Sequence, residues 1–387
     1  MKIGFVLDDS LDKADGVQQY ILTLGRWFTQ HGHEVHYLVG QTARRDIKHV
    51  HSLSRNLQVH FNQNRMSTPL PADKNQIKKL LEQERFDVLH VQLPYSPLMA
   101  GRVIRAVSPQ TAVVGTFHVI PFSKLESRAT RLLRLWLWRN IKRFDAVVSV
   151  SLPAQKFART KFKVKSQILP NPVQISAFNG GKRLKKYSDG KLNIVFLGRL
   201  VERKGCLHLL KALQLLHDQN SLLNVRVIIC GKGPLEQTLK NYVKEHRLAK
   251  IVQFVGFVSE DDKPDYLASA DLAVFPSLGG ESFGIVLIEA MAARSKIVIA
   301  GNNPGYHSIL HDRPKQLVDP TNTLQFAKTL KQFLYTNSLR RQSEIWQANE
   351  VKRYDVAVVG GQLLKLYQEL VAKRTNNSHN KSDVDQK

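Results

Sequence analysis

The chain has 387 residues, which is enough for two domains that each bury a core. Its 43% hydrophobic residues and 22 glycines are ordinary for a globular α/β protein, and only two cysteines exclude a disulfide framework or a cysteine metal site. The net charge of +25 is compatible with an anionic membrane, nucleic acid or an acidic substrate as partner, or with a solvated basic face.

The first residues predict a doubly wound parallel sheet. Residues 2–7 read as a strand, 16–31 as a helix and 34–39 as the next strand, which is a β-α-β start. The loop between the first strand and the helix lacks GxGxxG, which argues against a dinucleotide oxidoreductase. A chain that opens directly on a strand predicts no signal peptide, and no run of about 18 apolar residues predicts a membrane span.

A histidine ends one of the later strands of this half. Residues 87–91 and 111–117 read as buried parallel strands, and His118 follows the second of them. Open α/β sheets bind ligands at the carboxyl ends of their strands, so His118 is a candidate site residue. A lone histidine is more often structural, and both interpretations stay open on position alone.

Two helices of the first half are basic on one side. Residues 127–143 form an amphipathic pattern with two tryptophans, which can lie on an anionic bilayer or pack Trp136 into the core with the arginines in water. Residues 73–84 place Lys74, Lys78 and Lys79 on a polar side, which suits either a membrane or solvent. Lysine and arginine far outnumber acidic residues between 101 and 171, so the charge excess lies in this half.

Residues 168–173 mark the crossing into a second domain. We predict domains at residues 1–171 with a returning helix at 354–373, and at 172–353, followed by a disordered tail at 374–387. The second domain opens with a strand and the loop 198–205, which carries Arg199, Arg203 and Lys204. Isolated surface cations are the alternative interpretation of this loop.

The stretch 271–293 carries the strongest signal. Residues 271–276 read as a buried strand that Pro276 and a Gly-Gly turn end, and a helix with one apolar face follows. Glu281 is predicted at the helix N-terminus, where free N–H groups and the dipole suit a phosphate or a polarised hydroxyl. Glu289 lies eight residues on, about 12 Å along a helix axis. The plain alternative makes both glutamates ordinary surface residues of a helix.

The sequence ESFGIVLIEAMAA at 281–293 resembles the Glu-x7-Glu signature of family 4 retaining glycosyltransferases, in particular the bacterial phosphatidylinositol mannosyltransferases. The resemblance extends over roughly residues 1–373. It implies the GT-B fold, in which two Rossmann-like doubly wound domains face each other across a cleft and a C-terminal helix crosses back to the first domain.

The resemblance also implies a donor site. Glu281 would hold hydroxyls of the donor sugar and Glu289 the ribose of its nucleotide, while Arg199 and Lys204 would hold the diphosphate. His118 matches a family histidine near the reacting carbon. We therefore predict catalytic roles for His118, Arg199, Lys204 and Glu281. The remaining predicted donor contacts are Gly16, Ser282, Phe283 and Gly284.

On the acceptor side the match is less complete. The predicted acceptor contacts are Gln18, Phe61, Asn62, Arg65, Lys124 and Arg203. Asp15 stands where the family has a first glycine, and Val119 and residues 93–96 depart from the family pattern. These departures leave the identity of the acceptor open.

The predicted chemistry follows from charge. Loss of a nucleoside diphosphate builds negative charge, which fixed cations and helix N–H groups stabilise. A spacing of about 12 Å is too wide for a glycosidase pair. The resemblance implies same-face attack with retention, the departing phosphate taking the acceptor's proton. No Asp-x-Asp metal site is evident within the two halves, so we expect neither an obligatory metal nor a cofactor.

We predict a hexosyltransferase on the inner face of the cytoplasmic membrane that uses GDP-mannose and a lipid or lipid-linked acceptor. A soluble transferase acting on a small polyol or an oligosaccharide is the second interpretation. Charge alone allows a nucleic-acid-binding protein, although no RNP, zinc-knuckle or helix-turn-helix signature supports it. A GT-B epimerase or phosphorylase is a further alternative.

Overall fold

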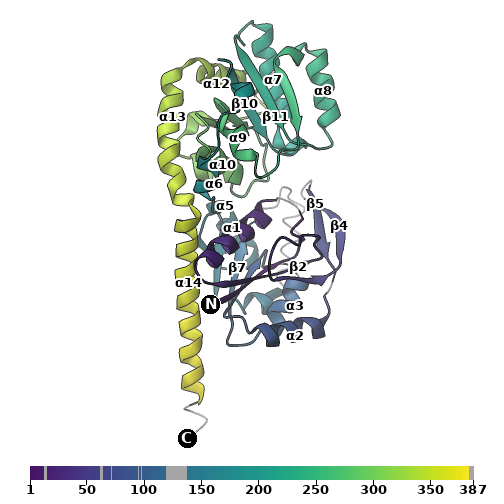
Figure 1. Ribbon diagram of the computed structural model, residues 1–387, viewed down its shortest axis with the longest axis vertical. Helices are drawn as coiled ribbons and strands as arrows, with labels where there is room; N and C mark the ends of the chain where they lie inside the picture. Colours follow the sequence, from purple (N-terminus) through teal and green to yellow (C-terminus); the bar gives the residue numbers. More distant parts are fainter. Residues whose placement is uncertain are drawn as a thin grey trace. The chain divides into compact units, whose positions relative to one another are not determined.

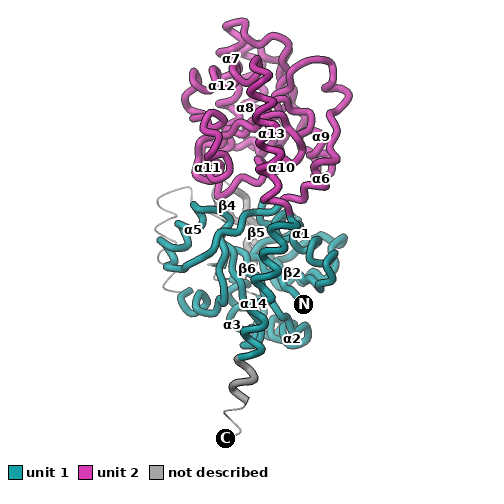
Figure 2. Tube along the Cα trace, turned by 90° about the vertical axis from the view of Figure 1, so that its left-hand side faces the viewer, with its two compact units in different colours: residues 1–172, 356–387 teal, residues 173–355 magenta. Residues whose placement is uncertain are grey.

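The computed structural model describes residues 1–12, 15–61, 64–70, 72–94, 96, 98–118 and 137–382. The chain divides into two compact units, which Figure 2 colours separately. Unit 1 comprises residues 1–172 and 356–387, and unit 2 comprises residues 173–355. The predicted boundary after residue 171 lies one residue before this division.

Unit 1 is built on a seven-stranded sheet of order β3-β2-β1-β6-β7-β8-β9, in which every described pair is parallel. The central strands are buried along their length, as expected where helices cover both faces. The strands are β1 Lys2–Leu7, β2 Glu34–Gly40, β3 Val50–Ser54, β6 Val88–Gln92, β7 Ala112–Phe117, β8 Ala146–Ser149 and β9 Gln167–Ile168. A separate antiparallel hairpin joins β4 Asn56–Phe61 to β5 Asn64–Pro69.

Helices cover both faces of this sheet (Figure 1). Because side chains alternate along a strand, Phe5 joins the core under α1 and α14, whereas Val6 joins the core under α2 and α3. The helices are α1 Gly16–Gln30, α2 Lys74–Glu84, α3 Met99–Ala106, α5 Leu152–Phe157, the π-helical η1 Ala158–Phe162 and α14 Val356–Ser382.

The last helix corrects one prediction. We predicted disorder from residue 374 onward, but α14 continues to Ser382. The Arg374 guanidinium bonds the Pro109 carbonyl at 3.0 Å and pairs with the Asp145 carboxylate. These long-range contacts anchor Arg374, whose surrounding sequence is polar and carries no local signal for order. Residues 383–387 of the predicted tail lie outside the described part of the chain.

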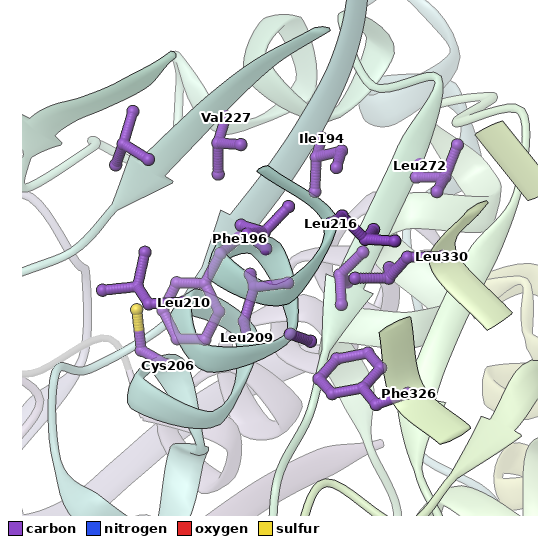
Figure 3. Packing of buried hydrophobic residues seen from close by; sticks show 14 of the residues in the cluster. Ile194, Phe196, Cys206, Leu209, Leu210, Leu216, Val227, Leu272, Phe326 and Leu330 are labelled. Carbon is purple, nitrogen blue, oxygen red and sulfur yellow. The ribbon is translucent and has the colours of Figure 1, made fainter. Parts of the chain in front are cut away.

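Unit 2 is built on a six-stranded parallel sheet of order β12-β11-β10-β13-β14-β15. Figure 3 shows part of its core, where Phe196 of the central strand lies near Leu209 and Leu210 of α7. The strands are β10 Leu192–Leu197, β11 Val225–Cys230, β12 Val252–Gly256, β13 Leu272–Phe275, β14 Val298–Gly301 and β15 Leu317–Val318.

The helices of unit 2 alternate with these strands along the chain, so both units are doubly wound parallel α/β folds, as predicted. The α-helices are α6 Ile175–Asn179, α7 Cys206–Asp218, α8 Glu236–Glu245, α9 Lys263–Ala268, α10 Ile285–Ala292, α11 Pro304–Leu310, α12 Thr323–Tyr335 and α13 Asn337–Glu350. Short 3₁₀ turns are η2 Lys185–Tyr187, η3 Glu202–Lys204, η4 Leu248–Lys250, η5 Pro314–Gln316 and η6 Val351–Tyr354.

Within the residues described, the helices are all too short or too polar to cross a bilayer.

Candidate active site

The loop after β13 carries Glu281, and it differs from the prediction in one respect. Helix α10 begins at Ile285, so Glu281 lies in the loop before the helix and not at its N-terminus. Gly280 (φ 71°) and Gly284 (φ 116°) both adopt left-handed backbone conformations, which break the helical path. The spacing of about 12 Å between the two glutamates assumed one continuous helix, and it therefore loses its basis.

The Glu281 carboxylate is the centre of a buried ionic cluster. One of its oxygens, Oε1, accepts hydrogen bonds from Arg203 Nη1 at 2.6 Å, Lys204 Nζ at 2.8 Å and Ser277 Oγ at 2.9 Å. Only 13% of the Glu281 side chain is exposed. Burial alone would raise its pKa, but the charges of Lys204 and Arg203 outweigh burial and lower the pKa to about 2. Glu281 is therefore ionised at every physiological pH.

Two loops must touch closely to form this cluster. Gly205 ends the cationic loop at φ 73°, and a Cβ there would lie 1.9 Å from the Pro276 carbonyl oxygen, so only glycine fits. The single Ser277 hydroxyl proton is shared between Glu281 Oε1 and the Arg203 carbonyl oxygen, each 2.9 Å from Oγ, and the Leu278 N–H donates to the same carbonyl at 2.8 Å. The backbone contacts fix the cations of one loop against the acid of the other.

Arg199 follows Gly198 in the loop after β10 and is partly buried. Burial lowers the pKa of Lys204, and the charges of Arg203 and Arg199 lower it further against the opposing effect of Glu281. Arg199 therefore belongs to the same electrostatic neighbourhood as Lys204. Arg203, which we predicted to face the acceptor, is bonded to Glu281 with 6% of its side chain exposed.

Glu289 is a buried residue of α10, which excludes the solvated-face interpretation. Its Oε1 lies 3.0 Å from Nζ of Lys263, which also lies 2.6 Å from Glu260 Oε2. Burial would lower the pKa of Lys263, but the charges of Glu289 and Glu260 outweigh burial and raise it. Sequence analysis missed Lys263. Its position at the start of the helix after β12, near the carboxyl end of that strand, is the signal that could have found it.

Two neighbours of Glu281 in the motif, Phe283 and Gly284, are packed against tyrosine rings. Phe283 is buried, with its ring centroid 5.6 Å from that of Tyr354. Gly284 lies against the Tyr306 ring, where a Cβ would approach within 2.5 Å. Ser282 is partly buried beside them.

In unit 1, His118 is buried at the carboxyl end of β7, as predicted from its position. Its Nε2 lies 2.7 Å from Gln92 Oε1, and the Tyr20 ring packs edge-on at 4.7 Å between centroids. Burial lowers the pKa of His118 to about 3, so the imidazole is neutral at physiological pH. A neutral ring can donate one hydrogen bond and accept another, but it supplies no positive charge.

The strand-to-helix loop of unit 1 holds two further predicted residues. Gly16 is the first residue of α1, and Gln18 is buried in its first turn. The Gln18 amide donates to the Ser10 carbonyl at 3.1 Å, so part of its hydrogen-bonding capacity is used within the loop.

Asp8, at the end of β1, was missed by the sequence analysis. Its carboxylate accepts from the Ala100 N–H at 2.8 Å and from the Ser96 hydroxyl. Burial raises the pKa of Asp8 to about 6. The Asp8-Asp9 pair directly after a strand is a signal that could have identified it.

Several predicted acceptor residues cannot be placed at side-chain level. Asn62 and Lys124 lie outside the described residues. Phe61 and Arg65 are described only as backbone positions of the β4–β5 hairpin. Most of the predicted helix 127–143 also lies outside the described residues, which resume at Leu137.

Each half of the chain matches a model of a known protein family. The family model for Glycosyltransferase Family 4 matches residues 14–177, and the model for Glycosyl transferases group 1 matches residues 182–350. The chain belongs to the GT-B glycosyltransferases. The matches confirm the predicted family and show that the enzyme is a glycosyltransferase, while the predicted hexose donor and retention stay predictions.

Relatives match this glycosyltransferase over nearly its whole length. It is 29% identical over 373 residues to phosphatidyl-myo-inositol mannosyltransferase of Mycobacterium leprae, covering 95% of the chain and 96% of the relative. The enzyme of the same name from Propionibacterium freudenreichii is 27% identical over 381 residues, with 95% and 94% covered.

Solved structures share the fold at low identity. A glycosyltransferase from Rickettsia africae aligns with a TM-score of 0.75 at 16% identity, covering 96% of this chain and 98% of that one. Anabaena Alr3699/HepE in complex with UDP and glucose aligns with a TM-score of 0.72 at 16% identity, covering 95% and 100%.

The glycosyltransferase thus brings Arg203, Lys204 and Glu281 into one cluster, with Glu289 and Lys263 in a second. Both lie in unit 2 beside the carboxyl ends of its parallel strands, where open α/β sheets bind ligands. Lysine and arginine side chains that pair with carboxylates in the absence of ligand can turn to the oxygens of a diphosphate when one binds.

Proposed function

We propose that this glycosyltransferase transfers mannose from GDP-mannose to a lipid or lipid-linked acceptor of the phosphatidylinositol type, with retention of anomeric configuration. The observation that carries the proposal is the buried, ionised Glu281 held between Arg203 and Lys204. The relatives matched over 95% of the chain are named for mannosyl transfer to phosphatidyl-myo-inositol, which supports the sugar and the acceptor class.

In the proposed reaction the bond between the anomeric carbon and the diphosphate oxygen breaks. Lys204 and Arg199 stabilise the negative charge that develops on the phosphate, and Glu281 accepts a hydrogen bond from a sugar hydroxyl. The acceptor hydroxyl attacks from the face that the phosphate leaves, and its proton passes to a phosphate oxygen. The products are the glycosylated acceptor and a nucleoside diphosphate.

His118 has a positioning role in this scheme. Because its imidazole is neutral, it can hold a sugar hydroxyl by a hydrogen bond without opposing the positive charge on the anomeric carbon. Glu289 accepts from the ribose hydroxyls, and Lys263 keeps that carboxylate in place.

We also propose that the reaction needs no divalent metal, since the side chains of Lys204 and Arg199 already supply positive charge at the phosphate. Transfer should therefore continue unchanged when EDTA is present in excess over all metals. Loss of transfer in EDTA, restored by Mg²⁺ or Mn²⁺, would contradict this part of the proposal.

The acceptor is proposed to be reached at a membrane surface, the inner face of the cytoplasmic membrane. Unit 1 carries a groove of about 1000 Å³ formed by α2, α3 and α14. Its basic lining residues are Lys74, Lys78, Arg85, Arg102 and Arg105. Trp138, also in unit 1, is exposed, and the Lys142 ammonium lies 4.4 Å from the centroid of its ring. Cations of this density favour an anionic lipid surface.

The deciding experiment supplies purified protein with GDP-mannose, UDP-glucose or ADP-glucose, together with phosphatidylinositol vesicles, free inositol or a mannose oligosaccharide. We expect transfer from GDP-mannose to the vesicle lipid, with an α-linked product by NMR. The UDP-glucose arm is included because the similar Anabaena structure holds UDP and glucose. Transfer to the soluble acceptors alone would establish the soluble-transferase alternative, and a β-linked product would refute retention.

A further inference from the structure

Unit 1 holds a group of histidines and glutamates that the proposed reaction does not use. Glu34 and His36 lie near the start of β2, and His51 lies on the neighbouring strand β3. Glu84 ends α2, shortly before β6 begins. These positions are at the amino-terminal edge of the sheet, whereas His118 marks the carboxyl edge. The group is therefore separate from the candidate active site of this unit.

The hydrogen bonds of His36 fix its proton. His36 is 1% exposed, and its Nε2 lies 2.8 Å from Glu34 Oε1. A carboxylate only accepts, so Nε2 carries a proton, and in the uncharged form of the ring Nδ1 offers a lone pair. That Nδ1 faces His51 Nε2 at 2.8 Å, and the two rings stack with an interplanar angle of 6°. Two imidazole nitrogens thus converge on one point.

A carboxylate completes a set of three donors. Single ligand atoms of His36, His51 and Glu84 all lie within 4.8 Å of one another, and Glu34, His36 and His49 form a second such set around the same ring. Donor atoms around a tetrahedral zinc ion lie about 3.4 Å apart, given metal–ligand bonds of about 2.0–2.1 Å. Side-chain shifts of about an ångström would bring the three donors to that spacing.

We propose that His36, His51 and Glu84 bind a divalent transition-metal ion, zinc being the ion that two imidazoles and a carboxylate best suit. The ion replaces the proton shared by His36 and His51. Glu34 keeps the His36 ring oriented through its bond to Nε2, which is the arrangement typical of metal-bound histidine. The ion joins β2, β3 and the end of α2, so its effect falls on the stability of unit 1 and not on sugar transfer.

Lys2 is a positively charged neighbour of the proposed metal ligands. Its ammonium lies 2.9 Å from Glu84 Oε2 and 3.1 Å from Glu34 Oε1, so it now occupies the position of a counter-cation. The Lys2 side chain is 25% exposed and can turn to solvent when an ion binds. Removing this competing charge should tighten metal binding, whereas removing an imidazole should weaken it.

The test uses tag-free, full-length protein stripped of metal, titrated with Co²⁺ by visible absorption and then with Zn²⁺ as competitor. We expect one equivalent of Co²⁺ with the spectrum of a low-coordinate nitrogen and oxygen site. His51→Gln should weaken binding at least tenfold, and Lys2→Met should tighten it several-fold. His246→Gln, a histidine at the end of α8, is the matched control and should change nothing.

Folding of each variant is checked by circular dichroism, and Glu84→Gln replaces His51→Gln if that variant does not fold. Zn²⁺ should also raise the melting temperature of the wild type and of the control, but not of the imidazole variant. Absence of a Co²⁺ signal, or equal affinities for wild type, His51→Gln and Glu84→Gln, would overturn the proposal. Glycosyl transfer is not the readout, so the outcome is independent of the proposed function.

Discussion

At the carboxyl ends of its strands, unit 2 pairs buried acids with cations, whereas unit 1 places a neutral imidazole, His118, and an acid of raised pKa, Asp8. Glu281 and Glu289 are each buried against a cation in unit 2. In unit 1, His118 is bonded to Gln92, and burial lowers its pKa to about 3. Two sheets with corresponding strand orders therefore carry different side chains at their carboxyl edges. The paired charges of unit 2 form an ionic edge that suits a charged nucleotide, and the neutral imidazole of unit 1 suits the hydroxyl groups of a sugar or a lipid headgroup.

The largest effect is expected where the ionic edge is broken. Glu281→Gln keeps the shape of the side chain but leaves Arg203 and Lys204 buried without their counter-ion. We expect transfer to fall by at least about 10³-fold, the scale found when a preorganised polar group is lost from an active site. Unfolding free energy should fall by about 3–5 kcal/mol, because two buried cations lose their partner.

Initial rates and denaturant unfolding measure both effects. The control is Glu236→Gln, which removes an acid paired with Lys240 on the surface of α8. A Glu281→Gln enzyme with wild-type turnover would remove the ionic cluster from the proposed mechanism.

The second prediction tests whether the ionic edge binds the nucleotide. Glu289→Gln should raise the KM for the donor about 10–100-fold with a smaller change in kcat, since a ribose contact contributes to ground-state binding. Lys263→Met should raise the KM for the donor by a similar factor. In the double variant KM should rise by less than the product of the two single-variant factors, because the two residues are in contact. Glu260→Gln is a matched control, because Glu260 also pairs with Lys263 but is 47% exposed. Equal KM values in all variants would place the nucleotide elsewhere.

The third prediction uses pH to compare the two edges. The pKa of His118 is lowered from 6.5 to about 3, so between these values the unfolded chain binds a proton that the native chain excludes. Unfolding free energy should therefore fall as pH drops below 6.5, by about 1.4 kcal/mol per pH unit for this group. Glu281, whose pKa is lowered from 4.5 to about 2, weakens its own unit only below pH 4.5.

Acid should consequently destabilise unit 1 before unit 2. His90, also lowered to a pKa of about 3 by burial, adds to the slope. Asp8 acts in the opposite direction, since its raised pKa of about 6 favours the native state at low pH. Hydrogen exchange at pH 7, 6 and 5 resolves the two units. His118→Gln should reduce the pH dependence of unit 1, and an unchanged slope would show that this histidine is not buried as a neutral ring.

The smallest effect per residue is expected at the proposed lipid face of unit 1. Changing Lys74, Lys78 and Lys79 to serine should weaken binding to anionic vesicles by about 1 kcal/mol per lysine, and the loss should diminish at high salt. Co-sedimentation measures it. Lys244, Lys250 and Lys328 are exposed lysines of unit 2, and the same change there is the control. Equal losses from both triple variants would indicate that net charge alone drives binding.

Sequence patterns predicted the elements that depend on local signals. Buried parallel strands such as β7 and β11 are continuous apolar runs, so their positions and the two-sheet fold were readable. Glu281 and Glu289 were found because their motif resembles that of a known family. The cations Arg199 and Lys204 were found for the same reason.

What the sequence did not predict depends on contacts distant along the chain. The start of α10 at Ile285 follows from the left-handed Gly284, which lies against the Tyr306 ring. The partnership of Lys263 with Glu289 joins groups 26 residues apart. The continuation of α14 beyond residue 373 brings Arg374 to Asp145, and these two residues are 229 residues apart. No window of local sequence contains these pairs.

The glycine at residue 205 has a consequence for redesign of this enzyme. The backbone of Gly205 lies directly against the Pro276 carbonyl, with no space for a side chain. The loop that ends at Gly205 and the loop that follows β13 therefore fit only each other. Grafting either segment alone from an enzyme of different donor preference would create a backbone clash or an empty space. Donor exchange should therefore succeed only when both segments are transplanted together.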